Sequence, residues 1–118
     1  SAARNDLKGI MLVNSGVENE NIEKTKNAVV EQLEEIKNGN FTDDDINFAE
    51  MAIKNDFKSV ADSAGNVSSW YFDCIRKNDI VTPEEKLERY IGVSKERIIA
   101  AAKSMMLDSV YVLTGNEE

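Results

Sequence analysis

The stretch TPEEKLERYIGVSKERIIAAAKSMM, residues 82–106, contains the clearest local folding signals of the sequence. Thr82 and Glu85 have the spacing of a capping box, and Pro83 suits a first helical position, where its missing N–H costs nothing. Gly92 predicts the end of that short helix, and a second helix is expected directly after it. The apolar residues expected to face a core on this second helix are Ile98, Ile99, Ala101, Ala102, Met105 and Met106.

Two stretches have the composition of strands. GIMLVNSG (9–16) is apolar on both faces and bounded by glycines, which predicts a buried strand. SVYVLTG (109–115) is rich in β-branched and aromatic residues and predicts a second strand. Two strands alone do not make a stable sheet. Three pairings are therefore left open: with each other, with another protomer, or with sequence outside this chain.

Three further helices are expected between residue 21 and residue 77. Asn21 is placed to cap the first of them with its side-chain oxygen, and Gly39 to end it. Thr42 and Asp45 resemble a capping box at the start of the second helix. The apolar stripe of the first helix is Ile22, Val29, Val30, Leu33 and Ile36, and that of the second is Ile46, Ala49, Ile53, Phe57 and Val60.

The segment DSAGNVSS (62–69) interrupts the helical period and predicts a loop or hinge before the third of these helices. The apolar residues of this third helix are Val67, Trp70, Tyr71, Cys74 and Ile75. Trp70 is expected as a core anchor rather than an exposed contact. The acids Asp43, Asp44 and Asp45 favour a helix N-terminus. A calcium loop would need oxygen ligands spread over a longer pattern with a turn glycine.

The net charge of −8 argues against nucleic acid and membrane surfaces as partners, because both are bound by clustered Lys and Arg. The acidity is interpreted as solvated helix faces, with attraction for basic peptides as the alternative. No apolar run approaches the length of a membrane span, and residues 1–9 lack the apolar core of a secretory signal. A single cysteine fits a reducing compartment, so we expect a cytoplasmic protein.

The chain contains no histidine, which removes the usual zinc catalytic sets and the Ser–His–Asp and Cys–His arrangements. Cys74 has no imidazole base and is interpreted as a small buried hydrophobe. Neither GxxxxGK[ST] nor GxGxxG occurs. The sequence therefore predicts no catalytic residue, no cofactor-binding residue and no metal ligand in this chain.

The order of landmarks resembles one family of proteins. The segments are KGIMLVNSGVENENIEK (8–24), EQLEEIKNGNFTDDDINFAEMAIKND (31–56), TPEEKLERYIGVSKERIIAAAK (82–103) and VYVLTG (110–115). In this order they resemble the C-terminal, non-catalytic domain of the pitrilysin, insulysin and mitochondrial processing peptidase superfamily of zinc metallopeptidases, the inverzincins, and its small bacterial members in particular.

The resemblance implies an α+β fold, helix-rich, in which an antiparallel sheet has helices packed on one face. This chain would be about the second half of such a domain, in the order strand, five helical stretches, strand. Residues 1–118 are then a single domain or subdomain of a larger chain. The zinc and the His-x-x-Glu-His helix of the family would belong to the parent protein, since no residue here matches that motif.

The function implied by the resemblance is a part of a zinc-metallopeptidase-like protein that completes a peptide-binding chamber and supports domain packing, without catalysis by this segment. The expected partners are the rest of the parent chain or a paired subunit, a peptide substrate, and a second copy joined through an exposed strand edge. The alternative from another class is a stand-alone acidic helical module that binds a protein. The length of the encoding gene distinguishes the two.

Overall fold

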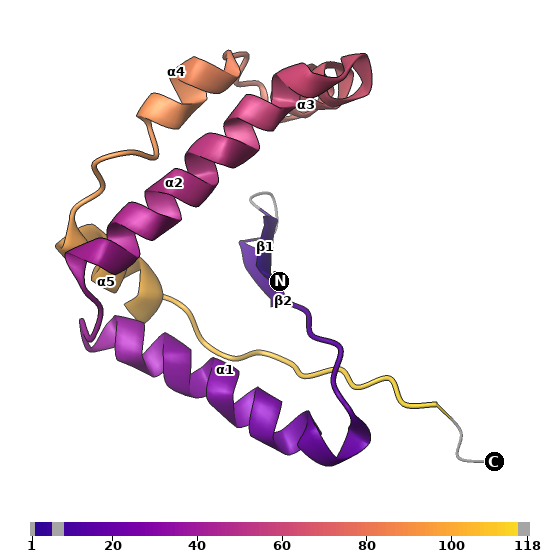
Figure 1. The fold of residues 1–118 in the computed structure, drawn as a ribbon, viewed down its shortest axis with the longest axis vertical. Helices are drawn as coiled ribbons and strands as arrows, with labels where there is room; N and C mark the ends of the chain where they lie inside the picture. Colours follow the sequence, from indigo (N-terminus) through magenta and orange to yellow (C-terminus); the bar gives the residue numbers. More distant parts are fainter. Residues whose placement is uncertain (1, 6–8, 116–118) are drawn as a thin grey trace. The chain divides into compact units, whose positions relative to one another are not determined.

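The computed structural model describes residues 2–5 and 9–115, and the chain divides into two compact units. Unit 1 comprises Ser1–Asn40 with Lys95–Glu118, and unit 2 comprises Phe41–Ser94. The elements, labelled in Figure 1, are β1 (Ala2–Asn5), β2 (Ile10–Val13), η1 (Asn19–Asn21), α1 (Ile22–Lys37), α2 (Asp43–Ser59), η2 (Val60–Asp62), α3 (Ala64–Lys77), α4 (Pro83–Glu88) and α5 (Lys95–Lys103).

Unit 1 begins with a β-hairpin, in which β1 pairs antiparallel with β2 from Ala2 opposite Val13 to Asn5 opposite Ile10. The predicted strand in residues 9–16 is therefore confirmed as β2. Its predicted burial is wrong, because its four side chains are 44 to 55% exposed. The hairpin pairs the strand along one edge, and among the described strands no other pairs with it.

The helix α1 starts differently from the prediction. The side chain of Asn21 makes no capping hydrogen bond, and the 3-10 turn η1 precedes the helix instead. At the other end the predicted stop is confirmed, because Gly39 has a left-handed backbone with φ of 75°. The amide of Asn40 donates to the carbonyl of Glu35, which satisfies one of the last helical carbonyls.

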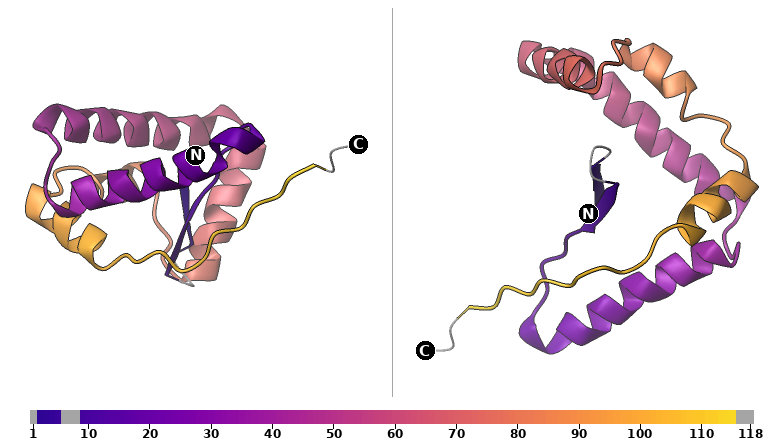
Figure 2. Two further views of the ribbon diagram at one scale, coloured as in Figure 1. Left: turned by 90° about the horizontal axis from the view of Figure 1, so that it is seen from below. Right: turned by 180° about the vertical axis from the view of Figure 1, so that it is seen from behind.

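The two helices of unit 1 meet near Gly39. The Cδ1 atom of Ile99 in α5 lies 3.1 Å from where a Cβ of residue 39 would stand. Figure 2 shows α5 beside the end of α1 in both of its views. Ala102 in α5 is buried, as predicted, whereas Met106 is 84% exposed and does not pack as expected.

Unit 2 is built around α2 and α4, which lie side by side (Figure 2). Both predicted capping boxes are confirmed. The amide of Asp45 donates to the Thr42 hydroxyl at 3.2 Å, and the amide of Thr42 donates to the Asp45 carboxylate at 2.8 Å. The same pair of bonds joins Thr82 and Glu85 at 3.2 and 2.8 Å.

The predicted loop or hinge at residues 62–69 exists only as a short break, formed by η2 and Ser63, and its expected extent is wrong. The helix α3 already starts at Ala64, because the Ser63 hydroxyl accepts a hydrogen bond from the amide of Asn66 at 3.1 Å. The break in apolar spacing marks a helix start, and the turn before it is only η2 and one residue long. Cys74 is buried on α3, as predicted, while Ile75 is 65% exposed.

The expected α+β architecture is also wrong for this chain. Among the described residues five α-helices dominate, and the hairpin β1–β2 is the whole of the sheet. The predicted closing strand is absent, because residues 104–115 follow α5 without pairing with another described strand. Strands need a neighbour for their N–H and C=O groups, and the sequence pattern of SVYVLTG supplies propensity without supplying that neighbour.

Candidate functional site

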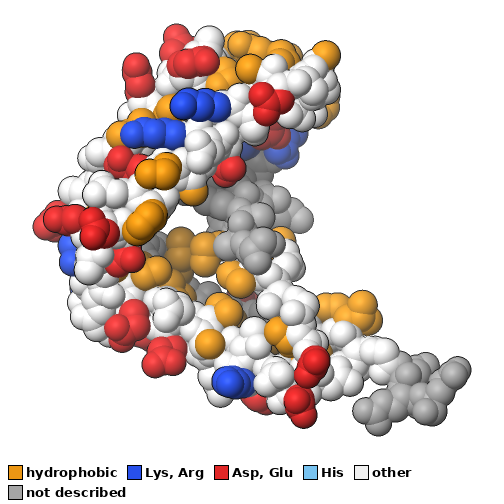
Figure 3. Space-filling view, viewed as in Figure 1, with side chains coloured by type: hydrophobic (Ala, Val, Ile, Leu, Met, Phe, Trp, Pro, Cys, Tyr) orange, Lys and Arg blue, Asp and Glu red, His pale blue; other side chains and the backbone are white. Residues whose placement is uncertain are grey.

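An apolar groove in unit 1 is a candidate site. It has a volume of about 840 Å³ and runs along α1, with β2 and the chain that follows it. The apolar residues that line it include Met11, Val13 and Val17 before the helix, and Val29, Leu33 and Ile36 on the helix. Figure 3 shows apolar side chains at the surface of the described residues.

The helical part of the groove follows from the spacing of residues on α1. Thr25, Ala28, Val29, Gln32, Leu33 and Ile36 line it, and they follow two rows of three- and four-residue steps, 25–28–32–36 and 25–29–33–36. Such residues share one face of an α-helix, so α1 presents one continuous stripe to the groove. Val29 and Ile36 are 38% and 36% exposed, so this stripe remains accessible to a ligand.

The groove carries almost no charge. Among its lining residues only Glu18 and Lys24 are charged, and they have opposite signs. In the view of Figure 3, acidic side chains lie at several places on the surface. The groove can therefore bury apolar side chains of a partner, at roughly 25 cal/mol for each Å² removed from water.

The sequence predicted the apolar stripe of α1 but not its position at an open groove. Val29, Leu33 and Ile36 of the predicted stripe line the groove, whereas Val30 does not. Met11, Val13 and Val17 were not predicted as surface residues. The available signal was the apolar run of residues 10–13. Its side chains point to both faces of a strand, and one helix can cover only one of these faces.

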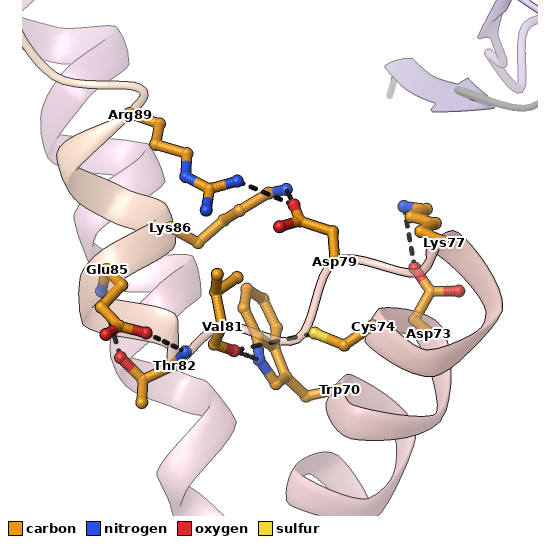
Figure 4. Close-up of polar contacts among 10 residues, drawn as sticks. All are labelled: Trp70, Asp73, Cys74, Lys77, Asp79, Val81, Thr82, Glu85, Lys86 and Arg89. Carbon is orange, nitrogen blue, oxygen red and sulfur yellow. Dashed lines mark hydrogen bonds and ion pairs between the residues drawn. The ribbon is translucent and has the colours of Figure 1, made fainter.

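Unit 2 contains a polar cluster around Asp79, shown in Figure 4. The Asp79 carboxylate accepts hydrogen bonds from Lys86 and Arg89, both at 2.8 Å. Asp73, one turn before the end of α3, pairs with Lys77 at 2.9 Å and with Arg76 at 2.6 Å. Each carboxylate is thus held by two cations, and Asp79 ties the end of α3 to α4.

These ion pairs change the acidity of both carboxyl groups. The hydrogen bonds from Lys86 and then Arg89 hold the pKa of Asp79 below its ordinary value. Lys77 and then Arg76 likewise lower the pKa of Asp73. A lowered pKa keeps each carboxylate ionised at neutral pH, so that it stays paired with its two cations. The ion pairs of Asp79 connect the end of α3 to α4.

Trp70 on α3 contacts Phe57 of α2 and the chain before α4. Its ring meets that of Phe57 edge-on with centroids 5.2 Å apart, and its indole N–H donates to the carbonyl of Val81 at 2.9 Å. The Cys74 thiol approaches the same carbonyl at 3.7 Å. Trp70 is half-buried and packs as the expected anchor.

The donor set does not fit a zinc centre. The chain lacks histidine, and among residues 2–5 and 9–115 no cluster of three His, Cys, Asp or Glu side chains could hold a metal ion. We therefore derive no step through a metal. Within the same ranges, no helix is both long and apolar enough to cross a membrane.

Comparison with known proteins gives one informative relative. The chain is 32% identical over 111 residues to a Bacillus subtilis (strain 168) protein named "Probable inactive metalloprotease YmfF". The aligned part is 94% of this chain and 26% of that protein, so the chain spans about a quarter of its relative. No protein-family model matches the chain. No solved structure matches it.

This likeness relates the chain to a part of a metalloprotease-like protein, in the direction that the sequence landmarks predicted. It extends through both units, because 94% of the chain is aligned. The groove of unit 1 and the polar cluster of unit 2 therefore both lie within a segment that is similar to that relative.

Proposed function

We propose that this chain is a non-catalytic part of a metalloprotease-like protein of the pitrilysin, insulysin and mitochondrial processing peptidase superfamily. Its role is to bind polypeptide, both as part of the wall of a peptide-binding chamber and in packing against the rest of the protein. The observation that carries the proposal is the uncharged apolar groove on α1, in a chain similar to a metalloprotease-like relative.

Three features support a binding role without catalysis. The lining of the groove is mainly apolar, its helix face is accessible, and its two charged residues are Glu18 and Lys24. The carboxylates with perturbed pKa values are paired with cations in unit 2. The relative is itself named as inactive, which agrees with a role that does not require peptide cleavage.

The test is binding of an unstructured, apolar peptide to the 118-residue chain, followed by the backbone amide resonances of the chain. We expect the resonances of α1 and β2 to shift and those of α2 and α4 to stay. Val29→Asp should abolish the shifts, because it places a charge in the groove. Val30→Asp is the matched control, since Val30 is equally exposed at 37% but does not line the groove.

Equal loss of binding in both variants, or shifts confined to unit 2, would contradict the groove as the site. Incubation of the same peptide with the chain and added zinc tests the non-catalytic part of the proposal. No cleavage products should form. Hydrolysis that a chelator stops would show that the segment is catalytic and would refute the proposal.

A further inference from the structure

Unit 2 contains a small pocket of its own, formed by residues that do not line the groove of unit 1. Its volume is about 130 Å³, which is below the roughly 300–1,000 Å³ of pockets that hold whole drug-sized ligands. It is lined by residues of α2, α3 and α4, of the chain that joins α3 to α4, and of the chain after α4. A pocket of this size has room for one group of about the size of an amino-acid side chain.

One part of the pocket lining is aromatic. Phe57, Trp70 and Tyr90 line it together with Cys74. The ring of Phe57 contacts both of the others, with its centroid 5.2 Å from that of Trp70 and 5.8 Å from that of Tyr90. The indole N–H of Trp70 already donates to the Val81 carbonyl (Figure 4). An apolar group is favoured beside these rings, because its burial there removes apolar surface from water.

The other part of the lining is charged, and it belongs to a cluster with more positive than negative groups. The charged lining residues form two ion pairs, Lys77 with Asp73 and Lys86 with Asp79 (Figure 4). Each carboxylate also pairs with an arginine that is outside the lining. The cluster thus has four cations and two carboxylates, a net charge of +2, in a chain whose net charge is −8.

Lys86 is the cation best placed to bind an anion in the pocket. Lys86 and Arg89 donate to the same oxygen of Asp79, Oδ2, both at 2.8 Å. Arg89 alone supplies the one positive charge that Asp79 requires, so the charge of Lys86 is in excess. The ammonium group has three N–H donors, and the bond to Asp79 uses one of them. The Lys86 side chain is 24% exposed, so a charge-assisted hydrogen bond from it would be partly shielded from solvent.

We propose that this pocket binds an apolar group that carries a carboxylate, with the apolar part against the aromatic rings and the carboxylate at Lys86. The positive charge of the cluster favours an anion over a cation, and the aromatic lining favours an anion with an apolar body over a bare one. Two sources share this chemistry: the C-terminal residue of a peptide and a small free apolar acid. The inference goes beyond the proposed function and does not rest on it.

Three small probes test the chemistry of the pocket. N-acetyl-leucine has the apolar side chain and the carboxylate, N-acetyl-leucinamide has a neutral amide in place of the carboxylate, and leucinamide carries a positive charge. The chain has one tryptophan, so its fluorescence and its indole N–H resonance both report on Trp70. N-acetyl-leucine should shift both signals and bind about tenfold or more tightly than either amide. No shift with any probe, equal affinity for the acid and its amide, or tightest binding of leucinamide would overturn the proposal.

Lys86→Met tests the cation, because it removes the ammonium group and keeps an unbranched side chain. It should weaken binding of N-acetyl-leucine about tenfold and leave binding of N-acetyl-leucinamide unchanged. Lys58→Met is the matched control, since Lys58 is an exposed lysine of α2 in the same unit that does not line the pocket. Equal loss in the two variants would overturn the proposal. If Lys86→Met does not fold, the order of affinities of the three probes for the parent chain still decides.

A hexapeptide that ends in leucine distinguishes the two sources. A shift of the Trp70 indole resonance with the free C-terminus, and none with the C-terminal amide, would support a peptide C-terminus as the ligand. Binding of N-acetyl-leucine without binding of the hexapeptide would support a small free acid. The groove of unit 1 is tested with an amidated peptide, which the pocket should not bind. Failure of either site would therefore leave the result for the other unaffected.

Discussion

The two units of this chain differ in how their surfaces are used. Unit 2 is stabilised by contacts among its own residues. These are two capping boxes, an aromatic contact between Phe57 and Trp70, and an ion-paired Asp79. Unit 1 has a hairpin whose four apolar side chains in β2 are all at least 44% exposed. It also has an open groove along α1 and an extended, unpaired segment at 109–115.

The difference indicates that the units depend on partners to different degrees. The free energy falls when another polypeptide covers an exposed apolar strand or an uncharged groove. Paired ions and capped helices already have their polar partners within the chain. Unit 2 should therefore resist changes at its surface and respond to changes at its internal contacts. Unit 1 should respond most where its two helices meet.

Replacing Trp70 by alanine should have the largest effect on stability. The substitution removes the edge-on contact with Phe57 and leaves the Val81 carbonyl without its indole donor. We expect a loss of about 2–3 kcal/mol in the free energy of unfolding, since the ring is half-buried. Urea unfolding followed by far-UV circular dichroism measures it, because the chain then has no tryptophan fluorescence.

Phe72→Ala is the control for Trp70→Ala, because Phe72 lies on the same helix and is 71% exposed. It should change the free energy of unfolding by about 0.5 kcal/mol or less. Similar losses in the two variants would mean that Trp70 does not hold unit 2 together.

Gly39→Ala should have the next largest effect and tests unit 1. Residue 39 has φ of 75°, where a Cβ is strained, and the added Cβ would lie 3.1 Å from Cδ1 of Ile99. We expect a loss of about 1–2 kcal/mol in the free energy of unfolding. Gly16→Ala is the control, because no atom lies within 4 Å of its added Cβ and its φ is not left-handed. A larger loss at residue 16 than at residue 39 would refute this explanation.

Thr42→Ala compares the capped helix of unit 2 with the uncapped helix of unit 1. The substitution removes the hydroxyl that accepts from the amide of Asp45, and should cost about 1 kcal/mol. Asn21→Ala removes a side chain that makes no capping bond at α1, so its cost should be a few tenths of a kcal/mol. Thermal unfolding of both variants measures the difference, and equal shifts in Tm would disprove it.

The sequence predicted what depends on neighbouring residues and missed what depends on distant ones. The boxes at Thr42 and Thr82, the stop at Gly39 and the burial of Cys74 were predicted correctly, since each rests on a local pattern. The burial of Ile10–Val13 and a closing strand at 109–115 were predicted wrongly, because both need a partner strand or a covering layer that composition cannot supply. The groove was missed for the same reason.

Asp79→Asn should have the smallest effect, and that effect should depend on pH. Lys86 and Arg89 lower the pKa of Asp79 in the folded chain relative to the unfolded chain. A carboxyl with a lowered folded pKa stabilises the fold above its unfolded pKa of about 3.9, and the contribution is lost as the pH falls through the folded value. The variant should therefore unfold at lower urea concentration than the parent chain at pH 7, with the difference shrinking below about pH 4.

The control is Asp56→Asn on α2, a carboxylate for which the described residues show no ion pair. Its urea midpoint should match that of the parent chain at both pH values. Added salt should reduce the effect of Asp79→Asn at pH 7, because the cluster is exposed to solvent and its charges are screened. An effect of Asp79→Asn that is unchanged by acid and by salt would mean that the side chain acts through packing, and the ion pairs would then not explain how unit 2 fastens α3 to α4.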